Sequence, residues 1–420
     1  MKKILIIIWI CLPFVAMAQS QYYLVNDAVH YPDPVNPNLE VYLVNGGGAT
    51  VSYAGSIAGS YQWYQYNSDG SASIIDGATT NTLSNVDLDM GYYMMIDDVM
   101  NHYVWLVDYS RATFTSGLIS PVSDDECAFV SLEFTANDLY YCALQDQGYS
   151  VIKLVRKYNA IYNSWDPVTG NVKEMNEEVY SNKIPAPLMN TSIAVYDVYA
   201  DQLNLDVRIT LDDYEAVQVY ADIEEELDTA VVGANIQIES GAYAAPLRAT
   251  FTAQVNPAAN YYLWTVYKTD EDAENPIIRY TETDPANPLR YTFERAGRYK
   301  IELEVSTIGK RTQCKTVDEV TFHIVESFID VPNAFSPNSS PGVNDEFRVA
   351  YKSITKFRAY IVNRWGQKLF EWNDPAIGWD GKFGGKYVPP GVYFYVIEWE
   401  GADGQKGVKK GDVNILHGRK

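Results

Sequence analysis

Histidine and cysteine are scarce in this chain, which has only four of each among its 420 residues. The histidines are widely separated, and the sequence has no HExxH motif, no glycine-rich phosphate loop and no Gly-x-Ser-x-Gly motif. These absences predict a protein that is not an enzyme and that uses no metal or other cofactor. The 54 acidic residues still leave a pair of catalytic carboxylates open, because spacing in sequence does not fix spacing in the fold.

Basic residues are also few. The chain has 32 Lys and Arg against 54 Asp and Glu, which gives a net charge of −22. Binding to nucleic acid or to an anionic membrane needs clustered Lys and Arg, so we predict neither partner. The balance is uneven along the chain, because the region from Ser327 onward has 13 basic against 10 acidic residues.

Long apolar segments are missing everywhere except at the N-terminus. There, Lys2 and Lys3 precede an apolar stretch at 4–15, and Ala16-Met17-Ala18 has the small-x-small pattern of a cleavage site. The stretch is shorter than the roughly 20 residues that a spanning helix needs. We therefore predict a signal peptide at 1–18, export of the chain, and no transmembrane segment in the mature protein.

The cysteines of the mature chain would be Cys127, Cys142 and Cys314. Cys127 and Cys142 flank two strand-like segments joined by a turn. They could form a disulfide in an oxidising compartment, or they could be two buried thiols. We expect Cys314 to have no partner.

Tyrosine, by contrast, is abundant at 34 residues, and aromatic residues make up 14% of the chain. Aromatic side chains pack well on pleated, half-buried surfaces, and helical periodicity is almost absent. The sequence therefore predicts an all-β protein built from tandem β-sandwiches.

The first block resembles an immunoglobulin-like domain. It contains Trp63 and, thirty residues later, the D-x-G-x-Y pattern of Asp89, Gly91 and Tyr93. The resemblance implies that Trp63 packs at the centre of the sandwich and that Tyr93 forms a tyrosine corner. The usual cysteine is replaced by Met95, so this sandwich would lack the inter-sheet disulfide.

The next two blocks are also strand-like. In the second block, we interpret the acidic run at Glu224–Glu226 as a solvated loop rather than a metal site. The third block resembles a PKD-like domain, because Gly297-Arg298-Tyr299 leads into a long hydrophobic strand. It departs from that family after Trp264, where the usual glycine-rich turn is missing.

The last block combines aromatic residues with turn residues. Asn363-Arg364-Trp365-Gly366, Trp379-Asp380-Gly381 and Pro389-Pro390-Gly391 each predict a turn. The strand at 392–399 has apolar groups on both faces, so we expect it to be central in its sheet. We expect the tryptophans of this block to be buried when the sandwich assembles, including Trp365.

This block resembles the gliding motility-associated C-terminal domain of the Bacteroidetes, which is the type B sorting domain of the type IX secretion system. The ordered motifs are P-N-A-F-S-P-N, N-D-x-F, N-R-W-G-Q, G-W-D-G, P-x-G-V-Y-x-Y and K-G-x-V-x-I-L, over about 329–416. The resemblance implies recognition by the secretion machinery and association with an outer-membrane partner protein. The expected sorting-domain motif residues are Asn363, Arg364, Trp365, Gly366, Trp379, Asp380, Gly381, Gly391, Tyr393, Lys409, Lys410 and Gly411.

The expected organisation follows from these blocks. A signal peptide at 1–18 precedes an immunoglobulin-like sandwich at 19–119, a sandwich of uncertain family at 120–234, a PKD-like sandwich at 235–326 and the sorting domain at 327–420. We expect a secreted, cell-surface protein with an adhesive or structural role, and association with the outer membrane is a further expectation. A carbohydrate-binding protein with a glycan or protein ligand is the alternative, and a hydrolase is a more distant one.

Overall fold

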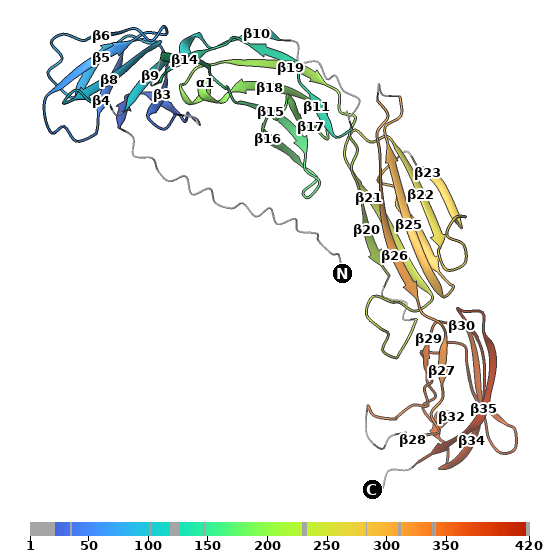
Figure 1. Cartoon of the computed structure of the whole chain (residues 1–420). Helices are drawn as coiled ribbons and strands as arrows, with labels where there is room; N and C mark the ends of the chain where they lie inside the picture. The colour runs from blue at the N-terminus through green and yellow to red at the C-terminus, as the bar shows by residue number, and fades with distance from the viewer. Residues whose placement is uncertain are drawn as a thin grey trace. The chain divides into compact units, whose positions relative to one another are not determined.

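The computed structural model describes residues 22–33, 36–100, 102–117, 127–145, 148–228, 233–282, 284–309, 312–337, 339 and 342–416. The predicted signal peptide lies outside these residues. Nearly all regular elements are strands, which confirms the all-β prediction (Figure 1). In the described part of the chain, no helix is long and apolar enough to cross a membrane. The chain divides into two compact units at Gln218 and Val219, and the finer boundaries stay predictions.

The first unit begins with a sandwich of two sheets. The smaller sheet has the strand order β1-β4-β7, and the larger has the order β2-β3-β9-β8-β5-β6. These strands are β1 (Tyr23–Val25), β2 (Ala28–Tyr31), β3 (Leu39–Val44), β4 (Ala49–Tyr53), β5 (Tyr61–Tyr66), β6 (Ala72–Ile74), β7 (Thr82–Val86), β8 (Met90–Ile96) and β9 (Tyr103–Asp108), followed by the 3-10 helix η1 (Tyr109–Arg111).

Trp63 lies at the centre of this sandwich, as predicted. Its side chain is fully buried, and its Nε1 donates a hydrogen bond to the Thr80 carbonyl over 2.9 Å. Tyr23, Tyr92 and Met94 belong to the same core cluster. An aromatic ring of this size dominates the apolar area that the core removes from water.

The tyrosine corner is formed by Tyr92, so the prediction of Tyr93 is wrong. The Tyr92 hydroxyl donates to the Asp87 carbonyl over 3.0 Å, and its ring faces the Trp63 core. Side chains alternate between the two faces of a strand, so Tyr93 and Met95 face the opposite side of the sheet. The position of the usual cysteine, two residues after the corner, is therefore occupied by Met94.

The six-stranded sheet is buried on both faces, which explains the continuous apolar runs of β3 and β9. On its second face, side chains such as Tyr66 and Trp105 form a core with residues from the second half of the unit. That half contributes Tyr141, Cys142 and Tyr199 to this shared core. The two halves are thus joined by packing as well as by the chain.

The second half of the first unit contains a four-stranded sheet, β16-β15-β18-β19, and three two-stranded sheets. Its elements are β10 (Phe114–Gly117), β11 (Phe129–Ser131), β12 (Phe134–Ala136), β13 (Tyr140–Gln145), β14 (Gly148–Lys153), β15 (Tyr158–Trp165), β16 (Val172–Glu178), β17 (Lys183–Pro185), β18 (Thr191–Asp197), the helix α1 (Val198–Gln202) and β19 (Arg208–Tyr214).

A buried polar cluster joins the two halves. Asp197 caps α1 by accepting hydrogen bonds from the Tyr199 and Ala200 amides, each over 2.9 Å. The same carboxylate accepts the Tyr109 hydroxyl over 2.9 Å and pairs with Arg156 Nε over 2.6 Å. Arg156 and Asp197 are almost completely buried, so removing either partner would leave an uncompensated charge in the interior.

The second unit begins with a sandwich of a three-stranded sheet, β20-β21-β24, and a four-stranded sheet, β23-β22-β25-β26. Trp264, Phe251 and Phe293 are buried in its core. Its strands are β20 (Ala221–Leu227), β21 (Leu247–Val255), β22 (Tyr261–Lys268), β23 (Ile278–Glu282), β24 (Leu289–Phe293), β25 (Gly297–Ser306) and β26 (Lys315–Ile324).

The acidic run at Glu224–Glu226 belongs to strand β20, so its interpretation as a loop is wrong. The strand pairs with β21 over its whole length, while the three glutamates stay exposed. Backbone pairing does not depend on the polarity of exposed side chains, and this is why an acidic segment can be a strand.

The C-terminal part of the second unit has a five-stranded sheet of order β28-β35-β34-β30-β31, with two small sheets, β27-β29 and β32-β33. The strand at 392–399 falls within β34, which lies third of the five, so the prediction of a central strand is confirmed. The elements are β27 (Phe328–Asp330), β28 (Ala334–Phe335), β29 (Ala350–Lys352), β30 (Ile354–Val362), β31 (Lys368–Trp372), β32 (Lys382–Phe383), β33 (Lys386–Tyr387), β34 (Gly391–Gly401) and β35 (Lys406–Ile415).

Two cysteine predictions can be assessed. Cys142 is a free, buried thiol, whereas Cys127 is disulfide-bonded, so the two neither pair with each other nor form two buried thiols. Cys314 is disulfide-bonded, so the prediction that it has no partner is wrong.

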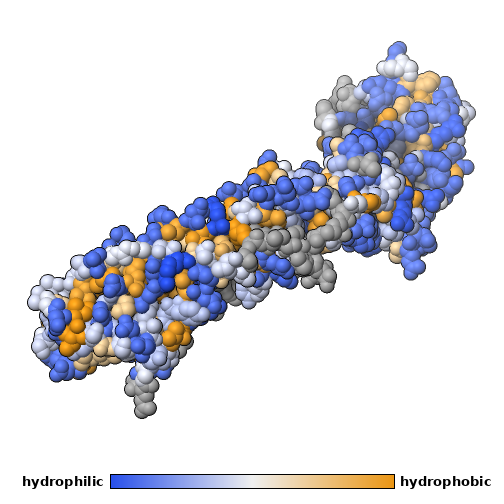
Figure 2. Space-filling view, turned by 90° about the horizontal axis from the view of Figure 1, so that it is seen from above, coloured by the Kyte–Doolittle hydropathy of each residue, from blue (hydrophilic) through white to orange (hydrophobic). Residues whose placement is uncertain are grey.

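The surface carries hydrophobic side chains throughout. On the face seen in Figure 2, hydrophobic residues are interspersed with hydrophilic ones. Most exposed apolar residues of a β protein need no special explanation. A large aromatic ring in a tight turn is a different case, and one occurs in the C-terminal domain.

Replacing Trp63 by alanine is expected to lower the free energy of unfolding by about 3–5 kcal/mol, because the change empties the centre of a packed core. Chemical denaturation of the purified protein measures this loss. The control is Tyr180→Ala, since Tyr180 is strongly exposed and its loss should change stability by less than about 0.5 kcal/mol. Equal effects of the two changes would show that Trp63 is not a core residue.

Candidate functional site

The motif Asn363-Arg364-Trp365-Gly366 forms the tight turn between β30 and β31, as predicted. The Asn363 side chain holds the turn, because its Oδ1 accepts the amides of Trp365 and Gln367, each over 3.0 Å. The Gly366 amide donates to the Asn363 carbonyl over 2.9 Å, and Gly366 has a φ of 82°, which favours glycine. The turn is therefore rigid without support from the core.

Trp365 is 76% exposed, so the expectation that it is buried is wrong. Its only ring partner described is the Arg364 guanidinium, which lies 4.3 Å from the ring centroid. By contrast, Trp372 and Trp379 are buried in the core of the domain, and Trp399 packs against that core. The turn lies beyond the ends of the two strands, since β30 ends at Val362 and β31 begins at Lys368, so Trp365 has no core to enter.

Exposed apolar side chains also lie on the five-stranded sheet, on the strand that pairs with the residue before the turn. Val362, which precedes the turn, pairs with Phe394 of β34. Phe394 and Val392 are exposed on the same face of β34. On the neighbouring strand β35, the exposed Asp412 lies opposite Phe394 and the exposed Lys410 lies opposite Val396. We call Arg364, Trp365, Val392, Phe394 and Lys410 the tip surface. It combines two aromatic rings, one aliphatic side chain and two positive charges, and the Asp412 carboxylate lies beside Phe394.

The motif Trp379-Asp380-Gly381 is structural. Trp379 is fully buried, packs against Phe335 and Tyr393 with centroid distances of 5.6 Å, and donates from Nε1 to the Lys382 carbonyl over 2.9 Å. Asp380 closes the turn by accepting the Lys382 amide and by pairing with the Lys382 ammonium over 2.7 Å. Burial raises the pKa of Asp380, but the hydrogen bonds from Lys382 outweigh it and hold that pKa below its usual value.

Gly391 and Tyr393 form a tyrosine corner at the start of β34. The Tyr393 hydroxyl donates to the Pro389 carbonyl over 2.8 Å. Tyr299 does the same in the preceding sandwich, where its hydroxyl donates to the Arg295 carbonyl over 2.9 Å. A glycine two residues before the tyrosine begins the strand in both places. A Gly-x-Tyr pattern at the start of a strand therefore indicates such a corner in the sequence.

Lys409, Lys410 and Gly411, near the basic end of the domain, do not all have the same role. Lys409 donates from Nζ to the Ile329 carbonyl over 2.8 Å, which fixes its side chain across the sandwich. Lys410 points to the opposite face and is exposed. Gly411 lies opposite Tyr395, and a Cβ there would approach the Tyr395 hydroxyl to 2.5 Å. Lys410 is therefore the member of this group that remains available to a partner.

The C-terminal domain is also held by the sandwich before it. Asn235 pairs with β29, because its amide donates to the Tyr351 carbonyl over 3.1 Å and its Oδ1 accepts the Tyr351 amide over 2.8 Å. The fully buried Ser353 donates its amide to the Gly233 carbonyl over 2.9 Å and accepts the Ala245 amide on Oγ over 3.1 Å. Residues 233–245 thus act as an extra edge of the C-terminal domain.

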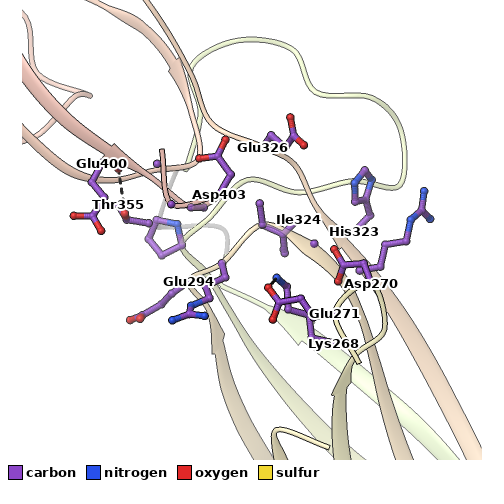
Figure 3. A pocket seen from close by; sticks show the side chains of 18 of the residues that line it. Lys268, Asp270, Glu271, Glu294, His323, Ile324, Glu326, Thr355, Glu400 and Asp403 are labelled. Atoms are coloured by element: carbon purple, nitrogen blue, oxygen red, sulfur yellow. Dashed lines mark hydrogen bonds and ion pairs between the residues drawn. The ribbon is translucent and has the colours of Figure 1, made fainter. Parts of the chain in front are cut away.

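A polar hollow of about 800 Å³ lies along the same contact (Figure 3). Figure 3 shows Lys268, Asp270 and Glu271 on one side of it and Thr355 and Glu400 on the other. Two ion pairs form within its two sides, since Lys268 pairs with Glu271 and Lys356 pairs with Glu400 over 2.9 Å. Among the described residues, no group of three or more His, Cys, Asp or Glu could hold a metal ion. We interpret this hollow as a solvated gap where the C-terminal domain contacts the preceding sandwich.

Replacing Gly381 by alanine is expected to destabilise the C-terminal domain by more than the roughly 1–2 kcal/mol that a Cβ costs in the left-handed region. Gly381 has a φ of 76°, and its Cβ would lie 2.9 Å from Pro337 Cγ. The matched control is Gly385→Ala, which has a φ of 80° and nothing within 4 Å of its Cβ. Thermal unfolding should separate the two variants, and equal losses would mean that the Pro337 contact has no effect.

The comparisons with known proteins identify one family and several structures of low similarity. Residues 329–415 match the family model of the CHU_C Type IX secretion signal domain. No curated protein matches the chain.

The FN1–FN3 domains of chicken CNTN1 are 9% identical, with 66% of this chain and 97% of that chain covered and a TM-score of 0.22. A Ca²⁺-stabilised, ice-binding adhesin of an Antarctic bacterium is 10% identical, with 94% and 99% covered and a TM-score of 0.20. Dimeric latent PorU from Porphyromonas gingivalis is 11% identical, with 77% and 36% covered and a TM-score of 0.16. At these TM-scores none of the structures informs the function.

Proposed function

We propose that this chain, whose residues 329–415 form a type IX secretion signal domain and which is therefore secreted or presented at the cell surface, is an adhesive or structural surface component. The signal domain implies an interaction with the type IX machinery. We further propose that the machinery contacts the tip surface and that an outer-membrane partner protein retains the exported chain. The proposed contact between the machinery and the tip surface rests on one observation, which is the exposure of Trp365.

The chemistry of the tip surface supports a protein partner. Tryptophan and arginine are the residues that most often dominate the binding energy of protein interfaces. The two amide hydrogen bonds that Asn363 Oδ1 accepts hold the turn in one conformation. The turn therefore loses little conformational entropy when a partner binds. Arg364 and Lys410 can pair with acidic groups around an apolar pocket on the partner, while Asp412 opposite Phe394 offsets part of their positive charge.

The remaining modules support an adhesive or structural role. The first unit is stiffened by a core and a buried ion pair that join its two halves. A stiff β-sandwich unit of this kind can carry a binding surface without needing catalytic groups. A role without catalysis stays a prediction, as does the absence of a cofactor. Binding of a glycan is the alternative for which a specific cavity exists, and it is argued in the next subsection.

Replacing Trp365 by alanine is expected to prevent most surface delivery of the full-length protein without unfolding it. Loss of a central interface tryptophan costs about 2 kcal/mol or more, which is roughly a thirtyfold loss of affinity. The measurement is the fraction of protein that external protease removes from intact cells with type IX secretion. Arg364→Ala should give a smaller loss in the same direction.

The matched control for these variants is Phe383→Ala, because Phe383 is an exposed aromatic residue of the same domain outside the tip surface. All variants must show the thermal unfolding of the unmodified protein. If Trp365→Ala and Phe383→Ala are delivered equally well, the tip surface is not the contact with the machinery.

A reporter fused to residues 219–420 is expected to reach the surface more efficiently than one fused to 327–420. The shorter fusion removes residues 233–245 and leaves β29 and Ser353 without their hydrogen-bond partners. Limited proteolysis of the two fusions should show faster cleavage of the shorter one. Equal delivery and equal resistance would mean that the sorting domain is independent of the preceding sandwich.

A further inference from the structure

A second cavity, of about 280 Å³, lies in the first unit between its two halves. Trp105, Asp89 and Arg111 line it from the first half, and Asp138, Tyr140 and Val151 line it from the second. We call it the junction pocket. It has no part in the proposed export, because none of its residues belongs to the C-terminal domain.

Trp105 lines the junction pocket, and its indole N–H has no acceptor among the described residues. The indole is 2% exposed and packs against Tyr66 with a centroid distance of 5.4 Å. In the described part of the chain, its buried Nε1 donates to no oxygen. A buried N–H without an acceptor costs free energy, and such groups in native proteins call for an explanation. A ligand oxygen would supply the acceptor.

The charged side chains of the pocket are engaged in ion pairs within the protein. Arg111 pairs with Asp89 and lies 3.7 Å from Asp108. Asp138 pairs with Lys153 over 2.6 Å, and the hydrogen bond from Lys153 is the main cause of the lowered pKa of Asp138. These pairs leave carboxylate oxygens and guanidinium N–H groups that can bind further polar groups. Because these charges are already paired within the protein, a neutral ligand rich in hydroxyl groups fits the pocket better than an ion does.

The pocket also offers apolar surface. Tyr140 and Val151 are both about half exposed, and the Tyr140 hydroxyl donates to Asp138 Oδ2 over 3.2 Å. This bond orients an aromatic ring beside polar groups, which suits a ligand with both C–H faces and hydroxyl edges. The volume is close to the lower limit of small-molecule sites, so it accommodates about one ring.

The lining is preorganised by Asn137. Its Oδ1 accepts the Thr113 amide over 2.9 Å, and its Nδ2 donates to the Arg111 carbonyl over 3.0 Å. The buried Arg156 donates to the Asn137 carbonyl over 3.1 Å. These bonds connect the pocket to the buried ion pair between Arg156 and Asp197, so the two walls hold a fixed separation.

From these features we infer that the junction pocket binds one neutral sugar ring of a glycan. The Trp105 N–H donates to a ring or hydroxyl oxygen, the Asp89–Arg111 pair binds adjacent hydroxyls, and Tyr140 packs against the C–H face. This inference deepens the adhesive role that is proposed for the protein. Its test uses purified protein, so failure of the export proposal would not affect the result.

The test is calorimetric titration of the full mature chain with glucose, galactose, mannose and N-acetylglucosamine, and with a β-linked disaccharide of each. At least one sugar is expected to bind with a dissociation constant in the millimolar range. Trp105→Phe keeps the ring but removes the N–H, so it should weaken binding about fivefold, as expected for one hydrogen bond. Tyr140→Ala should weaken it about tenfold, as expected for lost aromatic contact.

Tyr180→Ala is the control, because Tyr180 is an exposed aromatic residue of the same unit that does not line the pocket. It should leave the affinity unchanged. Tyr140 is exposed, so its variant remains informative even if Trp105→Phe impairs folding. The inference is overturned if none of the sugars binds at 20 mM, or if Tyr140→Ala binds as tightly as the unmodified protein.

Discussion

The packing of aromatic rings between sheets is the interaction on which each sandwich depends. Trp63, Trp264 and Trp379 are buried at the centres of three of them. Such rings remove more apolar surface from water than any other side chain and fix the separation of the sheets. Against that background, an exposed Trp365 in a turn that is rigid by itself gives no stability to the core. Its presence there is best explained by a partner.

Much of the fold could be predicted from the sequence because strand alternation and turn chemistry are local. The central position of β34 and the burial of Trp63 and Trp379 follow from such patterns. The tyrosine corner was misplaced by one residue because the six-stranded sheet is buried on both faces, and its apolar residues do not reveal which face holds Trp63. Strand β20 was missed because its exposed glutamates have the polarity of a loop.

The candidate sites were predictable to a smaller extent. The motif at Asn363–Gly366 identified the correct turn, but composition cannot tell whether a tryptophan in it is buried. Lys409 and Lys410 are adjacent in sequence, yet strand alternation sends them to opposite faces and gives them different roles. The junction pocket could not be found at all, because its residues are distributed between Ser68 and Val151 and only the packing of the two halves brings them together.

The central claim is that the secretion machinery contacts the folded C-terminal domain at Trp365. The most direct measurement places a photo-crosslinking amino acid at position 365 of the full-length protein in cells with type IX secretion, with position 383 as the control. The account predicts a crosslink from 365 to a component of the type IX machinery and none from 383. A crosslink from 383, with none from 365 in a folded and exported protein, would contradict it.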